Sequence, residues 1–248
     1  MGNQIEFCNV EKRYDKNQIL KGLTFSINEL EYVGLIGNNG CGKSTVINIL
    51  CNLIPYDEGD VLVFNRKVTP SYVSYKSKIG AIISTDILVN EFTPWEYLKF
   101  AGMFQNVDPV YINSRIHDLL NLFKLNINKK KIENLSSGEK MRVAFSAALI
   151  HNPAILILDE PFINMDNQTI DLISTFLYSL RGKKTLFITS HNLDLLFSLC
   201  NRFLILEGGI IIESINKDDL NDIGSFKKLI RSKTDLKTQG VFPENWLK

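Results

Sequence analysis

The amino-acid sequence predicts an α/β fold with a mostly parallel central sheet, an antiparallel β subdomain near the N-terminus and an inserted helical lobe. The first observation is a set of short apolar runs with little alternation, typical of strands buried on both faces: YVGLI (32–36), IGAII (79–83), AILIL (154–158) and TLFIT (185–189). Helical segments separate these runs, which favours a parallel sheet. The first third of the chain also carries a second, different strand pattern.

That second pattern predicts the antiparallel subdomain, from IEFCNV (5–10), LTFSI (23–27) and VLVFN (61–65), the last after the turn YDEGD. The helical lobe, at about 86–134, is predicted from the apolar spacing in WEYLKFAGMF and SRIHDLLNLFKL. A main domain would then cover 1–224. The remaining residues, 225–248, carry six Lys or Arg against two acids and are predicted to form a basic tail, either solvated or lying against the permease or the lipid surface of a membrane.

The composition allows one large domain and argues against several classes of protein. Of the 248 residues, 45% are hydrophobic and 22% are charged. The formal net charge is +1, so no overall field attracts the chain to nucleic acid or acidic lipid. The four cysteines, Cys8, Cys41, Cys51 and Cys200, form no C-x-x-C pair, which fits a reducing cytosol rather than a zinc or disulfide framework. No secretory signal and no apolar run of the ~20 residues that span a bilayer are recognisable. If the protein acts at a membrane, we expect another chain to supply the membrane part.

A phosphate-binding loop is predicted in YVGLIGNNGCGKSTVINIL, where a strand ends at Gly37 and a helix begins near Lys43. This stretch matches G-x-x-x-x-G-K-[ST] in the strand-to-helix context that the motif requires, which a chance glycine-rich turn would lack. Gly40 and Gly42 let the backbone wrap a phosphate, Lys43 reaches the β- and γ-phosphates, and the Ser44 hydroxyl can ligate Mg²⁺. The core is thus predicted to be a P-loop NTPase. The predicted nucleotide-binding residues of this loop are Asn38, Asn39, Gly40, Cys41, Gly42, Lys43, Ser44 and Thr45.

Two acids and a histidine follow other core strands, at the sheet edge where α/β folds place their sites. Asp159 and Glu160 end AILILDE; Asp159 would hold Mg²⁺ through water, and Glu160 would polarise the attacking water. Taken alone, the pair fits a catalytic role no better than a structural one, in which Asp159 caps a helix and Glu160 is solvated. His191 follows TLFIT and is predicted to reach the γ-phosphate. His117 and His151 are expected to be ordinary helix residues.

With these motifs together, the chain resembles the ATP-binding cassette of ABC transporters over roughly residues 3–215. GNNGCGKS resembles the Walker A loop, LILDEP the Walker B strand, NLSSGEK the family signature, NMD the D-loop and TSH the histidine switch. Tyr14, in KRYDKN, matches the aromatic residue that stacks on adenine in this family. The resemblance implies ATP and Mg²⁺ as cofactors, with Glu160 and His191 as the catalytic residues.

The signature has both a local and a family interpretation. Ser136-x-x-Glu139 is a capping box that opens the helix EKMRVAFSAALI. In the resembled family, two cassettes pack head to tail and each signature closes over the ATP of its partner. The resemblance therefore implies a homodimer or heterodimer around two ATP. The residues expected to act on the partner's ATP are Ser136, Ser137, Gly138, Glu139 and Asp166. Ser137 and Glu139 replace the usual Gly and Gln, and Asn164 in the D-loop is also unusual.

The resemblance further implies an ATP-hydrolysing subunit at the cytoplasmic face of a membrane, driving an integral membrane permease on a separate chain, with no nucleic acid expected. One alternative is a soluble cassette acting on ribosomes or nucleic acid, but the chain shows neither a second cassette nor a coiled-coil insertion. Another is a regulatory module that binds ATP without hydrolysis, against which Glu160 and His191 argue. The substrate, the direction of transport and the partner cassette stay open.

One position departs from the family in a way that concerns the metal. The family usually has a glutamine after the strand that here reads KIGAII, where its amide touches Mg²⁺; this chain has Ser84. Because serine is shorter, Ser84 would reach the metal only through a water, and Thr85 or Asp86 would compensate. We expect looser communication with the 87–95 surface, where a permease helix docks in this family.

Overall fold

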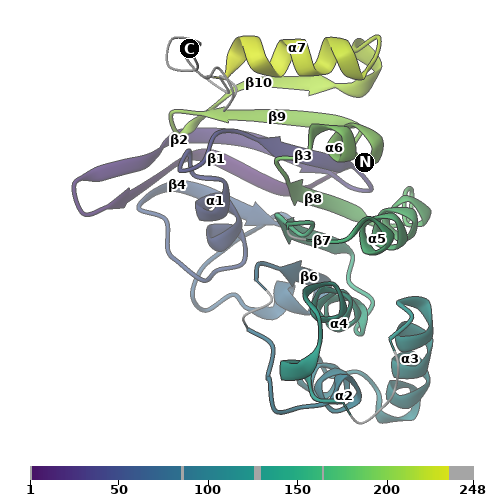
Figure 1. Ribbon diagram of the computed structural model, residues 1–248. Coiled ribbons are helices and arrows are strands. Elements are labelled where there is room, and N and C mark those ends of the chain that lie inside the picture. The colour runs from purple at the N-terminus through teal and green to yellow at the C-terminus, as the bar shows by residue number, and fades with distance from the viewer. Residues whose placement is uncertain (1, 85–86, 126–129, 164, 235–248) are drawn as a thin grey trace, which may run out of the picture.

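The computed structural model describes residues 2–84, 87–125, 130–163 and 165–234. Its larger sheet has the strand order β10-β9-β3-β8-β7-β6 (Figure 1). All neighbouring strands are parallel except β9 and β10, which pair antiparallel. The strands are β3 (Tyr32–Ile36), β6 (Ile79–Ile82), β7 (Ile155–Asp159), β8 (Thr185–Thr189), β9 (Arg202–Glu207) and β10 (Ile210–Asn216).

The four apolar runs of the sequence form β3, β6, β7 and β8, as predicted. Strands β9 and β10 were not predicted, although RFLILE and IIIESIN flank a Gly208-Gly209 turn in which both glycines have positive φ. They extend the sheet beyond β3, and β9 supplies the carbonyl of Leu206 that lies behind the phosphate loop.

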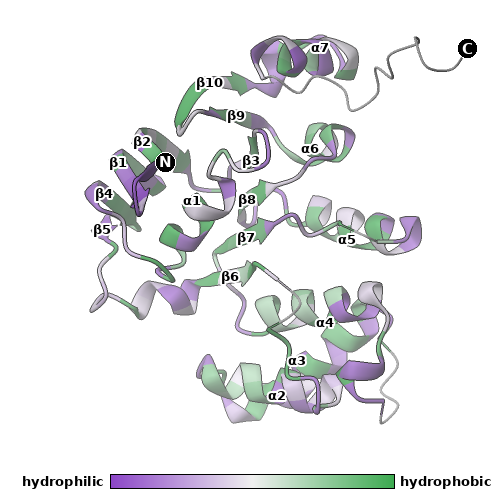
Figure 2. Ribbon diagram, turned by 60° about the vertical axis from the view of Figure 1, so that its left-hand side comes forward, coloured by the Kyte–Doolittle hydropathy of each residue, from purple (hydrophilic) through white to green (hydrophobic). Residues whose placement is uncertain are grey.

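The smaller sheet is antiparallel, as predicted, with the order β2-β1-β4-β5. Strands β1 (Asn3–Tyr14) and β2 (Asn17–Asn28) are longer than the predicted runs, whereas β4 (Glu58–Val63) and β5 (Arg66–Lys67) are short. Helix α1 (Lys43–Leu50) lies between the two sheets (Figure 2). Its Val46, Ile47 and Leu50 share one apolar core with residues of both sheets, which fixes the helix that begins at the phosphate loop.

A second core lies on the opposite face of the larger sheet, under α4 (Ser137–Leu149), α5 (Asn167–Ser179) and α6 (Leu193–Leu199). The helical lobe adds α2 (Pro94–Phe104) and α3 (Pro109–Leu122), which pack against each other and α4 (Figure 1). Thr93 and Asp108 cap these two helices, and a proline follows each cap, the usual helix-start chemistry. Among the described residues, short 3-10 helices cover Ser74–Lys78, Ile132–Asn134 and Lys217–Asp219.

Helix α7 (Ile223–Lys233) runs across the boundary predicted between 224 and 225. It lies beside β10 (Figure 1), and Phe226 and Ile230 are fully buried. The ring of Phe226 lies 4.4 Å from that of Phe203 in β9, centroid to centroid. Residues 225–234 therefore belong to the folded domain rather than to a solvated tail, because an apolar pair at i and i+4 outweighs the basic charges of the exposed face. The rest of the predicted tail lies outside the described residues.

Candidate functional site

The predicted phosphate loop connects β3 to α1 and has the backbone conformation that its glycines allow. Gly40 and Gly42 have φ of 79° and 112°, in the left-handed region that favours glycine. A Cβ at Gly37 would stand 2.4 Å from the carbonyl oxygen of Leu206, so this position has no room for a side chain. The buried ammonium of Lys43 donates to the carbonyls of Gly37 (2.8 Å) and Asn38 (3.2 Å), and these bonds hold the loop curved.

A cavity of about 260 Å³ opens in front of this loop. It brings together residues that are far apart in the sequence: Tyr14, Ile19, Asn39, Gly40, Gly42, Lys43, Ser44, Thr45, Glu160 and His191. Ile19, on β2, was not predicted, and its Cγ2 would lie 3.1 Å from a Cβ at Gly42. Two residues of the predicted phosphate loop are not in the lining: the Asn38 amide donates to Glu207 at 3.5 Å, and Cys41 lies half-buried with a pKa raised by burial.

Tyr14 ends β1 at the rim of the cavity and is 44% exposed. Its position is fixed by Asp57, which accepts the Arg13 N–H at 2.6 Å and the Lys12 ammonium at 3.1 Å. These bonds, the Arg13 N–H first, lower the pKa of Asp57. The Lys12 ammonium lies 5.5 Å from the centre of the Tyr14 ring, and the exposed area of the ring is free to stack on a planar base.

Glu160 and His191 meet at the edge of the cavity, as their places after β7 and β8 suggested. One Glu160 carboxylate oxygen accepts the backbone N–H of His191 at 3.1 Å, and the other lies 3.1 Å from Nε2 of the His191 ring. Burial raises the pKa of Glu160, while His191 and Lys43 act in the opposite direction. A partly buried carboxylate with a raised pKa beside a phosphate loop is suited to act as a general base toward water.

The residues that surround the loop offer oxygen ligands of the kind that Mg²⁺ prefers. Ser44 lies in the cavity lining, and Asp159 ends the neighbouring strand β7. Within the described part of the chain, no group of three or more His, Cys, Asp or Glu could hold a metal by itself. This donor set fits a Mg²⁺ that takes most of its ligands from phosphates and water.

The signature residues form a second cluster, which does not line this cavity. Ser136 caps α4: its hydroxyl accepts the Glu139 N–H at 3.2 Å, and the Glu139 carboxylate accepts the Ser136 N–H at 2.8 Å. The latter bond lowers the pKa of Glu139. A Cβ at Gly138 would stand 3.0 Å from the carboxylate of Asp166, which caps α5. Two helix N-termini thus meet here, and both Ser136 and Ser137 are exposed.

Comparison with known proteins now identifies the family. The sequence profile described as "ABC transporter" matches residues 20–163. The chain belongs to the ABC transporter family. It is 34% identical over 214 residues to the linearmycin resistance ATP-binding protein LnrL of Bacillus subtilis, covering 86% of this chain and 69% of that protein. It is 31% identical over 257 residues to the methionine import ATP-binding protein MetN of Clostridium acetobutylicum, covering 97% and 80%.

Solved cassettes share the fold. One is a dimeric ATP-binding cassette in a post-hydrolysis state bound to ADP and Pi, with a TM-score of 0.78, 26% identity and coverage of 86% of this chain and 98% of that one. Another is an ATP-binding subunit of an ABC transporter, with a TM-score of 0.81, 25% identity and coverage of 92% and 94%. The predictions of an ABC ATPase, of ATP binding and of a P-loop α/β fold are therefore confirmed.

Other predicted positions of the cassette lie elsewhere. Ser84 lines a separate groove together with Ile87 and Leu88, not the cavity in front of the phosphate loop. Thr85, Asp86 and Asn164 lie outside the described residues. His151 is half-buried at the end of that groove, where its Nε2 pairs with the carbonyl of Ile79 at 3.0 Å and burial lowers its pKa. In the described part of the cassette, every helix is too short or too polar to cross a bilayer.

Proposed function

We propose that this cassette dimerises head to tail around two Mg-ATP and drives an integral membrane permease on a separate chain, from the cytoplasmic face of the membrane. The observation that supports the dimer most is the cluster of signature residues. There the exposed N-terminus of α4 lies beside Asp166, outside the cavity of its own chain. Helix N-termini attract anions. Two such surfaces in one chain fit a site that is completed by a second chain.

Within each site, the roles of the chain's own residues follow from their positions. Tyr14 would stack on the base, and Lys43 with the loop N–H groups would hold the phosphates. Ser44 and, through water, Asp159 would hold Mg²⁺, which when bound neutralises charge on the phosphate oxygens. Glu160 would accept a proton from the attacking water, and His191 would keep its carboxylate aligned.

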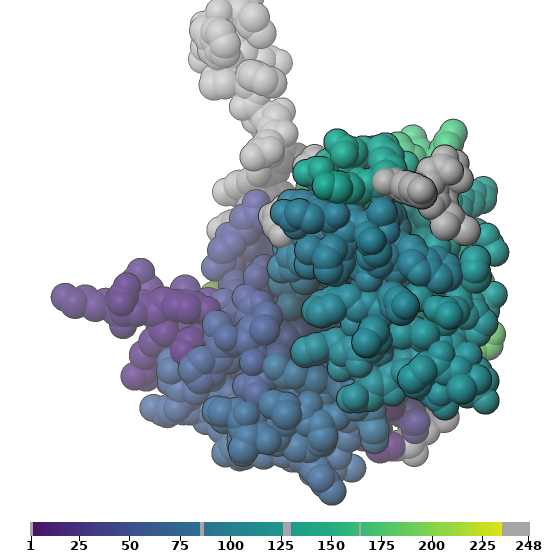
Figure 3. Space-filling view, turned by 90° about the horizontal axis from the view of Figure 1, so that it is seen from below, coloured from purple at the N-terminus to yellow at the C-terminus, as the bar shows by residue number. Residues whose placement is uncertain are grey.

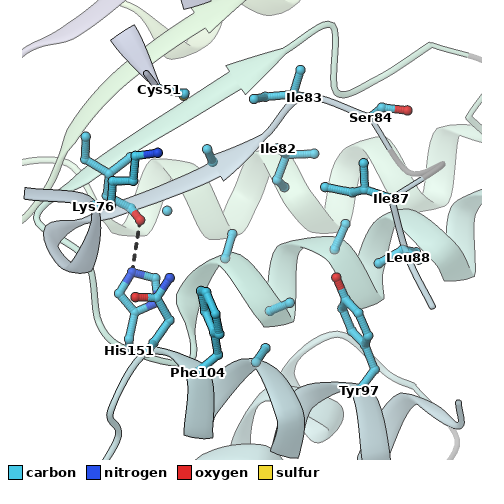
Figure 4. A pocket seen from close by; sticks show the side chains of 18 of the residues that line it. Cys51, Lys76, Ile82, Ile83, Ser84, Ile87, Leu88, Tyr97, Phe104 and His151 are labelled. Atoms are coloured by element: carbon cyan, nitrogen blue, oxygen red, sulfur yellow. Dashed lines mark hydrogen bonds between the residues drawn. The ribbon is translucent and has the colours of Figure 1, made fainter. Parts of the chain in front are cut away.

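The proposed permease contact is the groove that contains Ser84, with a volume of about 470 Å³. It lies between β6 and helices α2 and α4, where the blue and teal surfaces meet in Figure 3. Ile82, Ile87, Leu88, Tyr97 and Phe104 contribute to a mostly apolar lining (Figure 4). Ile87 and Phe104 are 67% and 76% exposed, which is unusual for such side chains and typical of a protein contact. An amphipathic cytoplasmic helix of the permease would fit this shape.

The relatives support the transporter setting and leave the substrate open. The names of two of them refer to linearmycin resistance and methionine import, and the name of a third, from Burkholderia lata, refers to Nod factor export. Because both import and export occur among them, we propose no substrate and no direction. The helical lobe, at about 86–134, would be the part of the cassette that meets the permease.

The dimer is tested with the Glu160→Gln variant, which should keep ATP bound while hydrolysis slows by roughly 10²–10⁴-fold. We expect sizing chromatography with Mg-ATP to show a dimer that reverts to monomer when ATP is removed. Lys43→Ala, treated identically, serves as the control and should stay monomeric. A monomer of Glu160→Gln at saturating Mg-ATP would contradict the homodimer.

The permease contact is tested by affinity purification from membranes solubilised in mild detergent. The parent cassette should retain a polytopic membrane protein, and Phe104→Asp should lose it while keeping its ATPase rate. Val110→Asp, an equally exposed apolar position on α3 outside the groove, serves as the matched control. Recovery of ribosomes instead of a membrane protein would support the soluble alternative.

A further inference from the structure

Thr189 connects the two acidic residues of the site. It is the first residue of the TSH motif, for which the sequence predicted a role only at His191. It is the last residue of β8 and is fully buried. Strands β7 and β8 are neighbours in the sheet (Figure 1), and Thr189 stands opposite Asp159 in their register. Its hydroxyl donates to the Asp159 carboxylate at 2.5 Å and accepts the backbone N–H of Glu160 at 2.9 Å.

These contacts fix the direction in which the hydroxyl donates. A threonine hydroxyl has one proton, and the N–H of Glu160 can only donate. The hydroxyl proton is therefore committed to Oδ1 of Asp159, as in a charge-assisted bond to a carboxylate. This bond takes up one acceptor position of Oδ1 and restrains the carboxylate, so that Oδ2, which accepts no bond from Thr189, would be the oxygen available to a metal's water shell.

The same hydroxyl supports an unusual backbone conformation at Glu160. Glu160 has φ of 47°, in the left-handed region that non-glycine residues rarely adopt. Its N–H is shared between the backbone carbonyl of Thr189, at 3.2 Å, and the Thr189 hydroxyl. This conformation directs the Glu160 side chain toward His191, two residues beyond Thr189.

We propose that Thr189 is a positioning residue that orients Asp159 toward Mg²⁺ and Glu160 toward the attacking water. This inference rests on the roles proposed above for the two acids. Groups that orient a metal-binding carboxylate commonly affect metal affinity or activity by 10–100-fold. Thr189 would therefore set how strongly Mg²⁺ improves nucleotide binding, as well as the hydrolysis rate.

The test uses Thr189→Val, which removes the hydroxyl and keeps the branched shape that the strand requires. ATP affinity is measured directly with Mg²⁺ and with a chelator, and kcat is measured separately. We expect the gain in affinity from Mg²⁺ to fall at least about tenfold, kcat to fall by a similar factor, and binding in chelator to stay unchanged. Thr189→Ser, which restores the hydroxyl, should recover most of both losses.

The chain offers a matched control at the other end of β8. Thr185 is also fully buried, and its hydroxyl likewise donates to one group, the Gln4 side chain at 2.7 Å, and accepts another, the Leu30 N–H at 2.8 Å. Thr185→Val should lower the melting temperature like Thr189→Val and leave the Mg²⁺ effect and kcat intact. Equal behaviour of the two valine variants in both measurements would overturn the proposal.

Two further variants keep the outcome decisive. Asp159→Asn is measured in parallel: if it leaves the Mg²⁺ effect intact, the metal role of Asp159 is wrong and the inference falls with it. If Asp159→Asn loses the effect and Thr189→Val keeps it, only the positioning role of Thr189 is overturned. Should Thr189→Val not fold, Thr189→Ser is compared with Thr189→Cys, which differ in one atom, and equal Mg²⁺ effects would overturn the proposal.

Discussion

At the scale of single residues, the site depends on a few polar groups whose positions are fixed by backbone contacts. Lys43 is held by two carbonyls of its own loop, Tyr14 by the bonds of Asp57 to its neighbours, and Glu160 by the end of β8. Such prior fixation lowers the ordering cost of ligand binding. It also means that each variant below needs a check of folding.

Lys43→Ala should weaken ATP binding, because it removes the fixed cation of the loop. A hydrogen bond to a charged group contributes about 1.5–3 kcal/mol, which corresponds to roughly a tenfold to hundredfold loss of affinity. Affinity is measured by titration calorimetry, with circular dichroism to confirm folding. An affinity equal to that of the parent in a folded variant would show that the loop does not bind the phosphates.

The pKa of Glu160 predicts the acid limb of the pH–rate profile. A general base is active when deprotonated, and burial raises this pKa above its ordinary value of 4.5. As the pH falls, kcat should therefore begin to drop at a higher pH than an ordinary glutamate would give. Glu160→Gln should abolish this limb along with most of the rate. An acid limb that persists unchanged in the residual activity of Glu160→Gln would assign it to another group.

At the scale of elements, helix ends matter more to the proposed function than helix interiors. Helices α2 and α4 both begin with a capping box, at Thr93 and Ser136. Only the α4 cap belongs to the cluster that would meet the partner's ATP. Variants of the two caps can therefore be compared to distinguish an effect on stability from an effect on the dimer.

Ser136→Ala and Thr93→Ala should each cost about 1 kcal/mol of unfolding free energy, the usual effect of a lost N-cap. Both are measured by denaturant unfolding. Only Ser136→Ala should also weaken the Mg-ATP dimer of a Glu160→Gln background. A similar loss of dimer in both variants would assign the effect to general destabilisation.

Helix α7 gives a second prediction at this scale. Phe226 is fully buried against Phe203 and Phe197, so Phe226→Ala should cost about 3–5 kcal/mol of unfolding free energy. Lys228→Ala, on the exposed face of the same helix, should stay within about 0.5 kcal/mol of the parent. A negligible change in unfolding free energy for Phe226→Ala would show that residues 225–234 are not part of the folded domain.

At the scale of the whole molecule, the sequence predicted what is local and missed what depends on distant packing. The phosphate loop and the polar residues at the strand ends follow from short motifs, and Lys43, Glu160 and His191 all line one cavity. Strand β10 was not predicted because it lies at the edge of the sheet and lacks the continuous burial of the central strands. Ile19 and Thr189 were not predicted because their roles come from contacts with distant parts of the sequence: Ile19 lies against Gly42 of the phosphate loop, and Thr189 bonds Asp159 of β7.

The central claim is that the signature of one chain completes the ATP site of another, and a mixing experiment tests it most directly. Lys43→Ala inactivates the phosphate loop and keeps the signature. Ser137→Glu places a negative charge at the signature, and an acid in the first turn suits the N-terminus of α4, so folding should persist. Each variant alone should hydrolyse ATP very slowly.

In a mixed dimer, the intact loop of the Ser137→Glu chain faces the intact signature of the Lys43→Ala chain, so one site of two is restored. With equal amounts, ATPase activity should rise well above that of either variant alone, up to about half of the parent rate if every chain joins a mixed dimer. Full activity of Ser137→Glu alone, or a mixture as inactive as its two components, would contradict the account.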